Sequence, residues 1–227
     1  MKDENDKVTV DAWAEAQQYG GVGEARIDPM KDAEAVTGRR HAGSKTADRK
    51  RSKWQTPEWL VQFLELRQKA RFDLDAAASE DNHKAPAYFT EQNCGLTADW
   101  SPYRFVFLNP PYDDITPWVE KAIEETKRNK HMVVHLVLPN DNSTYWYRLA
   151  AINSTDIINI IHDGKNSGRL AFIDPDTGKG VNNNNKGTQI FTMSGKGKAS
   201  VTRYLSRVNM MEKVESDYAK VFGDGSN

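Results

Sequence analysis

A rigid loop carrying an amide and an aromatic ring follows one of the buried strands that the sequence predicts. Asn109-Pro110-Pro111-Tyr112 comes directly after the apolar run Phe105–Leu108, and ligands in open α/β sheets bind beyond the carboxyl ends of the strands. The two prolines fix their own φ angles and restrict the residue before each of them, so the loop is rigid before a substrate binds. Asn109 and Tyr112 are therefore presented in a fixed relation.

This pair suits the chemistry of an aromatic exocyclic amine, a poor nucleophile because its lone pair is delocalised into the ring. The Asn109 side-chain oxygen and the Pro110 carbonyl could each accept one of the two N–H bonds. That arrangement favours a pyramidal nitrogen whose lone pair points at an electrophile. Tyr112 could stack on the planar base and hold it. The alternative is a proline-rich turn with a buried tyrosine and no catalytic role.

Helices that could position this loop begin at recognisable signals. Thr56 is predicted to cap a helix that has Pro57 at its first position, and Leu60, Phe63 and Leu64 mark its buried face. The pair Thr116-Pro117 opens a second helix in the same way, and Ser143 is predicted to cap a third.

Strands alternate with these helices. Besides Phe105–Leu108, we expect strands at 72–75, 132–138 and 157–161, which predicts an α/β fold with a mostly parallel sheet and helices on both faces. Short strands at 170–173, 189–193 and 201–205 predict an antiparallel hairpin at one edge of the sheet. A mostly polar helix follows at 207–222.

The net charge of −1 hides an uneven distribution. Residues 1–30 carry a net −4 and residues 37–53 a net +6. Neither stretch has an apolar period, so residues 1–53 are predicted to be a flexible arm, followed by a catalytic domain at 54–206 and a helix and tail at 207–227. The basic part of the arm is either a solvated linker or a segment that contacts DNA phosphates; the candidates for phosphate contact are Arg39, Arg40, Arg49, Lys50 and Arg51.

Composition excludes several classes of protein. No apolar run approaches the roughly 18 residues of a membrane span, and the acidic start does not resemble a signal peptide. The single cysteine excludes a disulfide framework and suits a reducing cytoplasm. The five histidines have no metal-ligand spacing, so we expect no metal, and His135 is predicted to be a core residue.

The sequence resembles the phage-type DNA adenine-N6 methyltransferases, the phage Dam family, whose catalytic motif is Asn-Pro-Pro-Tyr. The resemblance covers roughly residues 54–193. It rests on segments that occur in a fixed order: Trp54-Gln55-Thr56-Pro57, FDLDAAAS at 72–79 with Asn82, Tyr88-Phe89-Thr90, Gly95-Leu96 with Trp100, Asn109–Tyr112, Pro117-Trp118-Val119 and the weaker Gly168-Arg169-Leu170-Ala171-Phe172.

The resemblance implies a Rossmann-like methyltransferase fold that binds S-adenosylmethionine. It implies a catalytic role for Asn109, Pro110, Pro111 and Tyr112, and cofactor binding by Trp54, Thr56, Pro57, Asp75 and Asn82. A helix N-terminus at Thr56-Pro57 suits a carboxylate, and the Asp75 carboxylate could meet the ammonium group of the cofactor. DAAAS replaces the glycine-rich turn that is usual in the wider superfamily.

The implied reaction is methyl transfer to adenine N6 in double-stranded DNA, with the base flipped out of the helix. The family often targets GATC. Candidates for DNA contact, besides the arm, are the polar loop at 163–187, Arg169 and Phe172. We expect a monomer in the cytoplasm of a bacterium or of a phage-infected host, with a role in restriction-modification or regulation. The alternatives are methylation of cytosine N4, RNA adenine or protein glutamine, and a catalytically silent DNA-binding protein.

Overall fold

The computed structural model describes residues 54–181, 186–197 and 200–223. The predicted arm, with Arg39, Arg40, Arg49, Lys50 and Arg51, lies outside the described residues, as does the asparagine run at 182–185. The predicted domain boundaries at 53/54 and 206/207 stay predictions.

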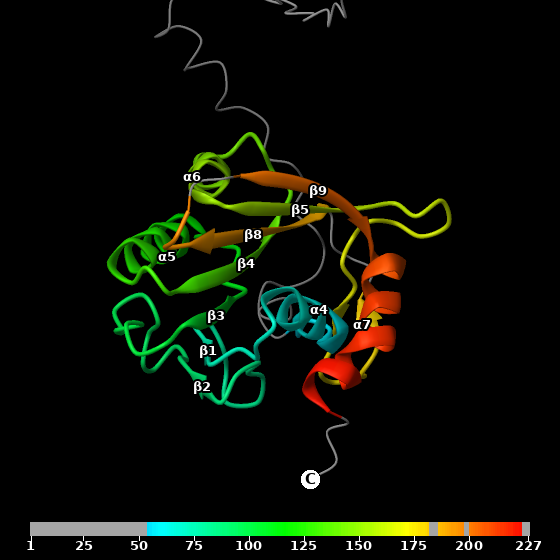
Figure 1. Ribbon diagram of the computed structural model, residues 1–227, viewed down its shortest axis with the longest axis horizontal. Coiled ribbons are helices and arrows are strands. Elements are labelled where there is room, and N and C mark those ends of the chain that lie inside the picture. The colour runs from blue at the N-terminus through cyan, green and yellow to red at the C-terminus, as the bar shows by residue number, and fades with distance from the viewer. Residues whose placement is uncertain (1–53, 182–185, 198–199, 224–227) are drawn as a thin grey trace, which may run out of the picture. The chain divides into compact units, whose positions relative to one another are not determined.

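Seven of the described strands form one sheet in the order β2-β1-β3-β4-β8-β5-β9 (Figure 1). All neighbouring strands pair in parallel except β8, which runs antiparallel to both β4 and β5. The strand bounds are β1 Leu74–Asp75, β2 Ala87–Tyr88, β3 Phe105–Leu108, β4 Val133–Pro139, β5 Asp156–Ile161, β8 Thr188–Ser194 and β9 Val201–Ser206. The predicted fold class, a mostly parallel sheet of Rossmann-like type, is confirmed.

The predicted edge hairpin is wrong, because β8 and β9 do not pair with each other. β8 is inserted between β4 and β5, and β9 forms the edge of the sheet beside β5. Burial explains the difference: Ile190 and Phe191 of β8 are fully buried, whereas the first four residues of β9 are exposed. The predicted strand at 170–173 is β6 (Phe172–Ile173), which pairs with β7 (Gly180–Val181) in a separate two-stranded sheet.

Helices cover both faces of the large sheet, as predicted. α5 (Thr116–Arg128) and α6 (Tyr145–Asn153) pack on one face, in a core that contains Trp100 and Phe191. α4 (Glu58–Gln68) and α7 (Arg207–Phe222) lie side by side on the other face, in a core that contains Phe107 and Ile190 (Figure 1). His135 of β4 is buried, as predicted, between Gln68 and Thr192.

The helix starts differ from the prediction by one residue. Pro57 is the N-cap of α4 and makes no side-chain cap hydrogen bond, so the helix begins at Glu58 and Thr56 does not cap it. The third helix, α6, is capped by Thr144 rather than Ser143, because the Thr144 hydroxyl accepts the backbone N–H of Tyr147. The Thr56 hydroxyl is thereby free for a tertiary contact.

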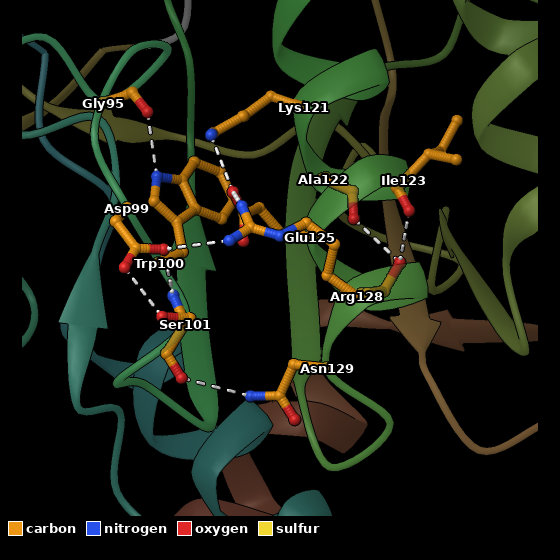
Figure 2. Close-up of polar contacts among 11 residues, drawn as sticks. Gly95, Asp99, Trp100, Ser101, Lys121, Ala122, Ile123, Glu125, Arg128 and Asn129 are labelled. Carbon is orange, nitrogen blue, oxygen red and sulfur yellow. Dashed lines mark hydrogen bonds and ion pairs between the residues drawn. The ribbon is translucent and has the colours of Figure 1, made fainter.

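A polar cluster fastens α5 to the segment that precedes β3 (Figure 2). The Trp100 indole donates to the Gly95 carbonyl at 2.8 Å, and the Lys121 ammonium lies over the Trp100 ring at 5.8 Å. The buried Glu125 carboxylate accepts from Lys121 at 2.7 Å and from Arg128 at 3.0 Å. Since α5 follows the Asn109–Tyr112 loop in the chain, this cluster fixes the far end of that loop.

Candidate active site

Asn109 stands at the carboxyl end of β3 with both ends of its amide engaged. Its Nδ2 donates to the Thr56 hydroxyl at 3.1 Å. Its Oδ1 accepts from the Tyr112 hydroxyl at 3.1 Å. Pro110 between them is buried. The loop therefore holds the amide and the tyrosine in the fixed relation that the two prolines predict.

Tyr112 has a buried hydroxyl and a partly open ring. The hydroxyl oxygen lies 3.3 Å from the carbonyl oxygen of Val137 in β4, and its burial raises the pKa of Tyr112, so the phenol stays neutral. The residue as a whole is 39% exposed. Its ring meets the edge of Phe172 with a centroid distance of 6.4 Å and an interplanar angle of 71°. A planar base could therefore reach this residue.

Thr56 joins the loop to the β6–β7 hairpin. Gln55, the residue before it, exchanges two backbone hydrogen bonds of 2.8 Å with Ile173 of β6. Phe172, the neighbour of Ile173, is the residue that packs on Tyr112. Three segments far apart in the chain, at 55–56, 109–112 and 172–173, thus meet around the Asn109 amide.

Asp75 lies at the carboxyl end of β1, the strand next to β3. It is in register with Phe107, two residues before Asn109. Its carboxylate accepts the backbone N–H of Ala77 at 3.3 Å and that of Lys84 at 2.9 Å. Burial raises the pKa of Asp75 to about 6, in spite of these two hydrogen bonds. Above that pH the carboxylate is a buried negative charge at the same edge of the sheet as Asn109.

A family model described as DNA N-6-adenine-methyltransferase (Dam) matches residues 43–217. The chain belongs to this family. A DNA N-6-adenine-methyltransferase of Escherichia phage T1 is 36% identical over 239 aligned positions, which cover 97% of this chain and 98% of the relative. One of Haemophilus phage HP1 (strain HP1c1) is 32% identical over 162 positions, with 70% of this chain and 90% of the relative covered.

Two predictions are therefore confirmed: that the chain is a member of the Dam family, and that it is an adenine-specific DNA methyltransferase. DNA is the substrate, and methyltransferases in general use S-adenosylmethionine. Within the described residues no group of three His, Cys, Asp or Glu side chains could hold a metal ion. The described part of the chain also contains no helix that is long and apolar enough to cross a membrane.

The other predicted site residues of this Dam-family chain lie in several settings. Trp54 is half-buried and packs against the core beneath α4, and Asn82 pairs its backbone with Ser79 in a turn. Arg169 is exposed, whereas Phe172 is buried behind Tyr112. A link between Phe172 and DNA would therefore pass through the Tyr112 ring, and the predicted roles of these residues stay predictions.

Some residues of the site escape sequence reasoning. The Val137 carbonyl and the Gln55–Ile173 pairing belong to the backbone, so no side-chain type indicates them. Outside these contacts, Arg207 lines a separate cavity of about 140 Å³ together with the predicted DNA contact Arg169. The only signal for Arg207 is its position at the start of the predicted terminal helix.

Proposed function

We propose that this chain uses S-adenosylmethionine to methylate the N6 amino group of adenine in double-stranded DNA, at GATC-like sites. The observation that carries the proposal is the Asn109 amide, held between Thr56 and Tyr112 at the carboxyl end of β3. This part of the chain lies inside the region matched by the Dam family model.

The loop acts by holding the amine. Asn109 Oδ1 and the Pro110 carbonyl accept the two N–H bonds, which localises the nitrogen lone pair, and Tyr112 stacks on the flipped base. The Tyr112 hydroxyl occupies Asn109 Oδ1 in the structure, so the incoming amine replaces that hydrogen bond. The proton of the product leaves to water, and a general base is not required.

The residues at this edge of the sheet fit a cofactor with an amino acid moiety. The first N–H groups of α4 have no side-chain cap, and they suit a carboxylate. The ionised Asp75 suits an ammonium group. Trp54, Pro57 and Asn82 are the further candidates for contact. When bound, S-adenosylmethionine supplies the methyl group that is transferred.

DNA contacts are proposed at two places. Arg169 and Arg207 present two cations around one small cavity beside the β6–β7 hairpin, and they would bind a backbone phosphate. The basic residues at 37–53 would add a contact that depends on salt but not on DNA sequence. We further propose a cytoplasmic monomer that acts in restriction-modification or regulation.

The proposal is tested by transfer of radiolabelled methyl from S-adenosylmethionine to unmethylated duplex DNA. Asn109→Ala should abolish transfer while cofactor binding stays measurable, and Asn153→Ala, on the remote helix α6, should leave it unchanged. An Asn109→Ala protein as active as the wild type would refute the catalytic assignment.

Substrate choice is tested by sequencing modified bases in a host that lacks its own methylation. N6-methyladenine within GATC is the expected product. Methylated cytosine, RNA or glutamine, or DNA binding without any transfer, would support one of the alternative functions instead.

A further inference from the structure

The described residues assign a second task to the segment before α4. We infer that Thr56 is a positioning residue for Asn109: the Thr56 hydroxyl binds the Asn109 NH₂ group and so holds the opposite end of the amide, Oδ1, toward the target amine. The inference rests on the proposed catalytic role of Asn109. It differs from the cofactor-binding role that the family resemblance implies for Thr56.

An asparagine at this position needs a partner that sets its orientation. The terminal torsion of the side chain is broad and roughly two-fold, so backbone geometry alone does not distinguish the oxygen from the NH₂ group. The two ends are opposite in function. Oδ1 accepts a hydrogen bond from the amine, whereas Nδ2 would place one N–H donor against another. A half-turn of the amide would therefore abolish the proposed contact without moving the loop.

Tyr112 cannot supply this orientation during the reaction. A phenol hydroxyl has one proton, and two acceptors lie within reach of it, Asn109 Oδ1 at 3.1 Å and the Val137 carbonyl at 3.3 Å. The amine of the substrate also replaces the tyrosine at Oδ1. The contact between Asn109 Nδ2 and Thr56 Oγ1, at 3.1 Å, lies at the other end of the amide, so an amine that binds Oδ1 does not have to displace it.

Thr56 itself is held on both sides. Gln55 is paired with Ile173 through two 2.8 Å hydrogen bonds, and Pro57 begins the turn into α4. Thr56 is 3% exposed and makes no cap contact with the helix, so its hydroxyl is not used by local structure. A buried hydroxyl on an anchored backbone gives the amide NH₂ group a fixed hydrogen-bond partner.

The test replaces the hydroxyl and keeps the shape. Thr56→Val leaves the Asn109 NH₂ without a partner, and we expect kcat to fall about 10- to 100-fold, while the Kd for S-adenosylmethionine changes less than about 2-fold. Thr56→Ser retains the hydroxyl and should keep kcat within about 3-fold of the wild type. The measurements are single-turnover methyl transfer, titration calorimetry with the cofactor, and the melting temperature.

Thr126→Val is the matched control, because the buried Thr126 hydroxyl bonds the carbonyls of its own helix, α5. It should change the melting temperature and leave kcat unchanged. Should Thr56→Val fail to fold, Thr56→Ala takes its place with the same expectation.

Two results would overturn the inference. In the first, Thr56→Val keeps its full kcat, or binds the cofactor much more weakly with kcat intact, as a cofactor ligand would. In the second, Thr56→Ser is as impaired as Thr56→Val. If Asn109→Ala is inactive in either case, the proposed function stands and only the role of Thr56 fails; an active Asn109→Ala removes both.

Discussion

In the proposed mechanism the Tyr112 hydroxyl competes with the target amine for Asn109 Oδ1, and this predicts that removing the hydroxyl does not weaken DNA binding. Tyr112→Phe removes the donor that occupies Asn109 Oδ1 and keeps the ring that packs on Phe172. The amine of the flipped base then meets a free acceptor. We expect Tyr112→Phe to bind target DNA at least as well as the wild type, in contrast to Tyr112→Ala.

The magnitudes follow from the contacts. A typical intramolecular hydrogen bond contributes about 0.5–1.5 kcal/mol net. Removing the Tyr112 hydroxyl therefore lowers the KM for DNA by no more than this free energy allows, about 2-fold to 13-fold. Tyr112→Ala loses the stacking on the base, about 1–3 kcal/mol, as well as the aromatic contact with Phe172. The KM for DNA should therefore rise about 5- to 150-fold in the alanine variant.

Steady-state methyl transfer to a duplex with one target site measures both variants, and a 2-aminopurine at the target position reports base extrusion by its fluorescence. The phenylalanine variant should give the fluorescence change of the wild type, and the alanine variant a smaller one. If Tyr112→Phe is as impaired as Tyr112→Ala, the hydroxyl is required in the reaction and the reasoning from competition is refuted.

Three further predictions concern other parts of the chain. Affinity for S-adenosylmethionine, measured by calorimetry, should rise between pH 5 and 7 as Asp75 ionises near its pKa of about 6, and Asp75→Asn should bind weakly with no such rise; a wild-type affinity independent of pH would contradict this. Burial lowers the pKa of His135 to about 3, so only the unfolded chain gains this proton as pH falls from 6.5, and stability is lost in that direction. Between pH 7 and 5.5 the free energy of unfolding, measured in urea, should fall by about 1.3 kcal/mol less in His135→Gln than in the wild type. An equal fall in both proteins would count against a neutral His135. A Cβ at Gly95 would lie 2.1 Å from the Ala76 carbonyl oxygen, so Gly95→Ala should lower the free energy of unfolding, measured by thermal unfolding, by about 1–3 kcal/mol. At Gly197 a Cβ meets nothing within 4 Å, so Gly197→Ala should change this free energy little.

Local sequence signals predict the elements of the fold well and their arrangement less well. The run Phe105–Leu108 and the prolines after it are strong signals, so the Asn109–Tyr112 loop and its place at a strand end follow from the sequence. The local sequence of residues 188–194 does not indicate that this strand lies inside the sheet rather than at its edge. That choice depends on burial of Ile190 and Phe191 on both faces, which is a tertiary effect.

The candidate site shows the same division between local and tertiary information. The sequence singles out Thr56, but a threonine before a proline is typical of a helix cap, and its hydrogen-bond partner, Asn109, is 53 residues away in the chain. The packing of Phe172 on Tyr112 depends on a small hairpin whose pairing with Gln55 has no side-chain signature. Residue types therefore indicate which groups matter, while long-range pairing decides what each of them does.

The position of β8 has a consequence for how the chain matures on the ribosome. β4 and β5 are synthesised first, and their facing edges stay unpaired until residues 188–194 emerge between them. At 5–20 residues per second, the 33 residues from 162 to 194 take about 2–7 s to make. Throughout that interval the nascent chain exposes two strand edges and a core without Phe191 and Met193, so the gap inside the sheet is filled only after both flanking strands have been made, and β9 is then added at the edge.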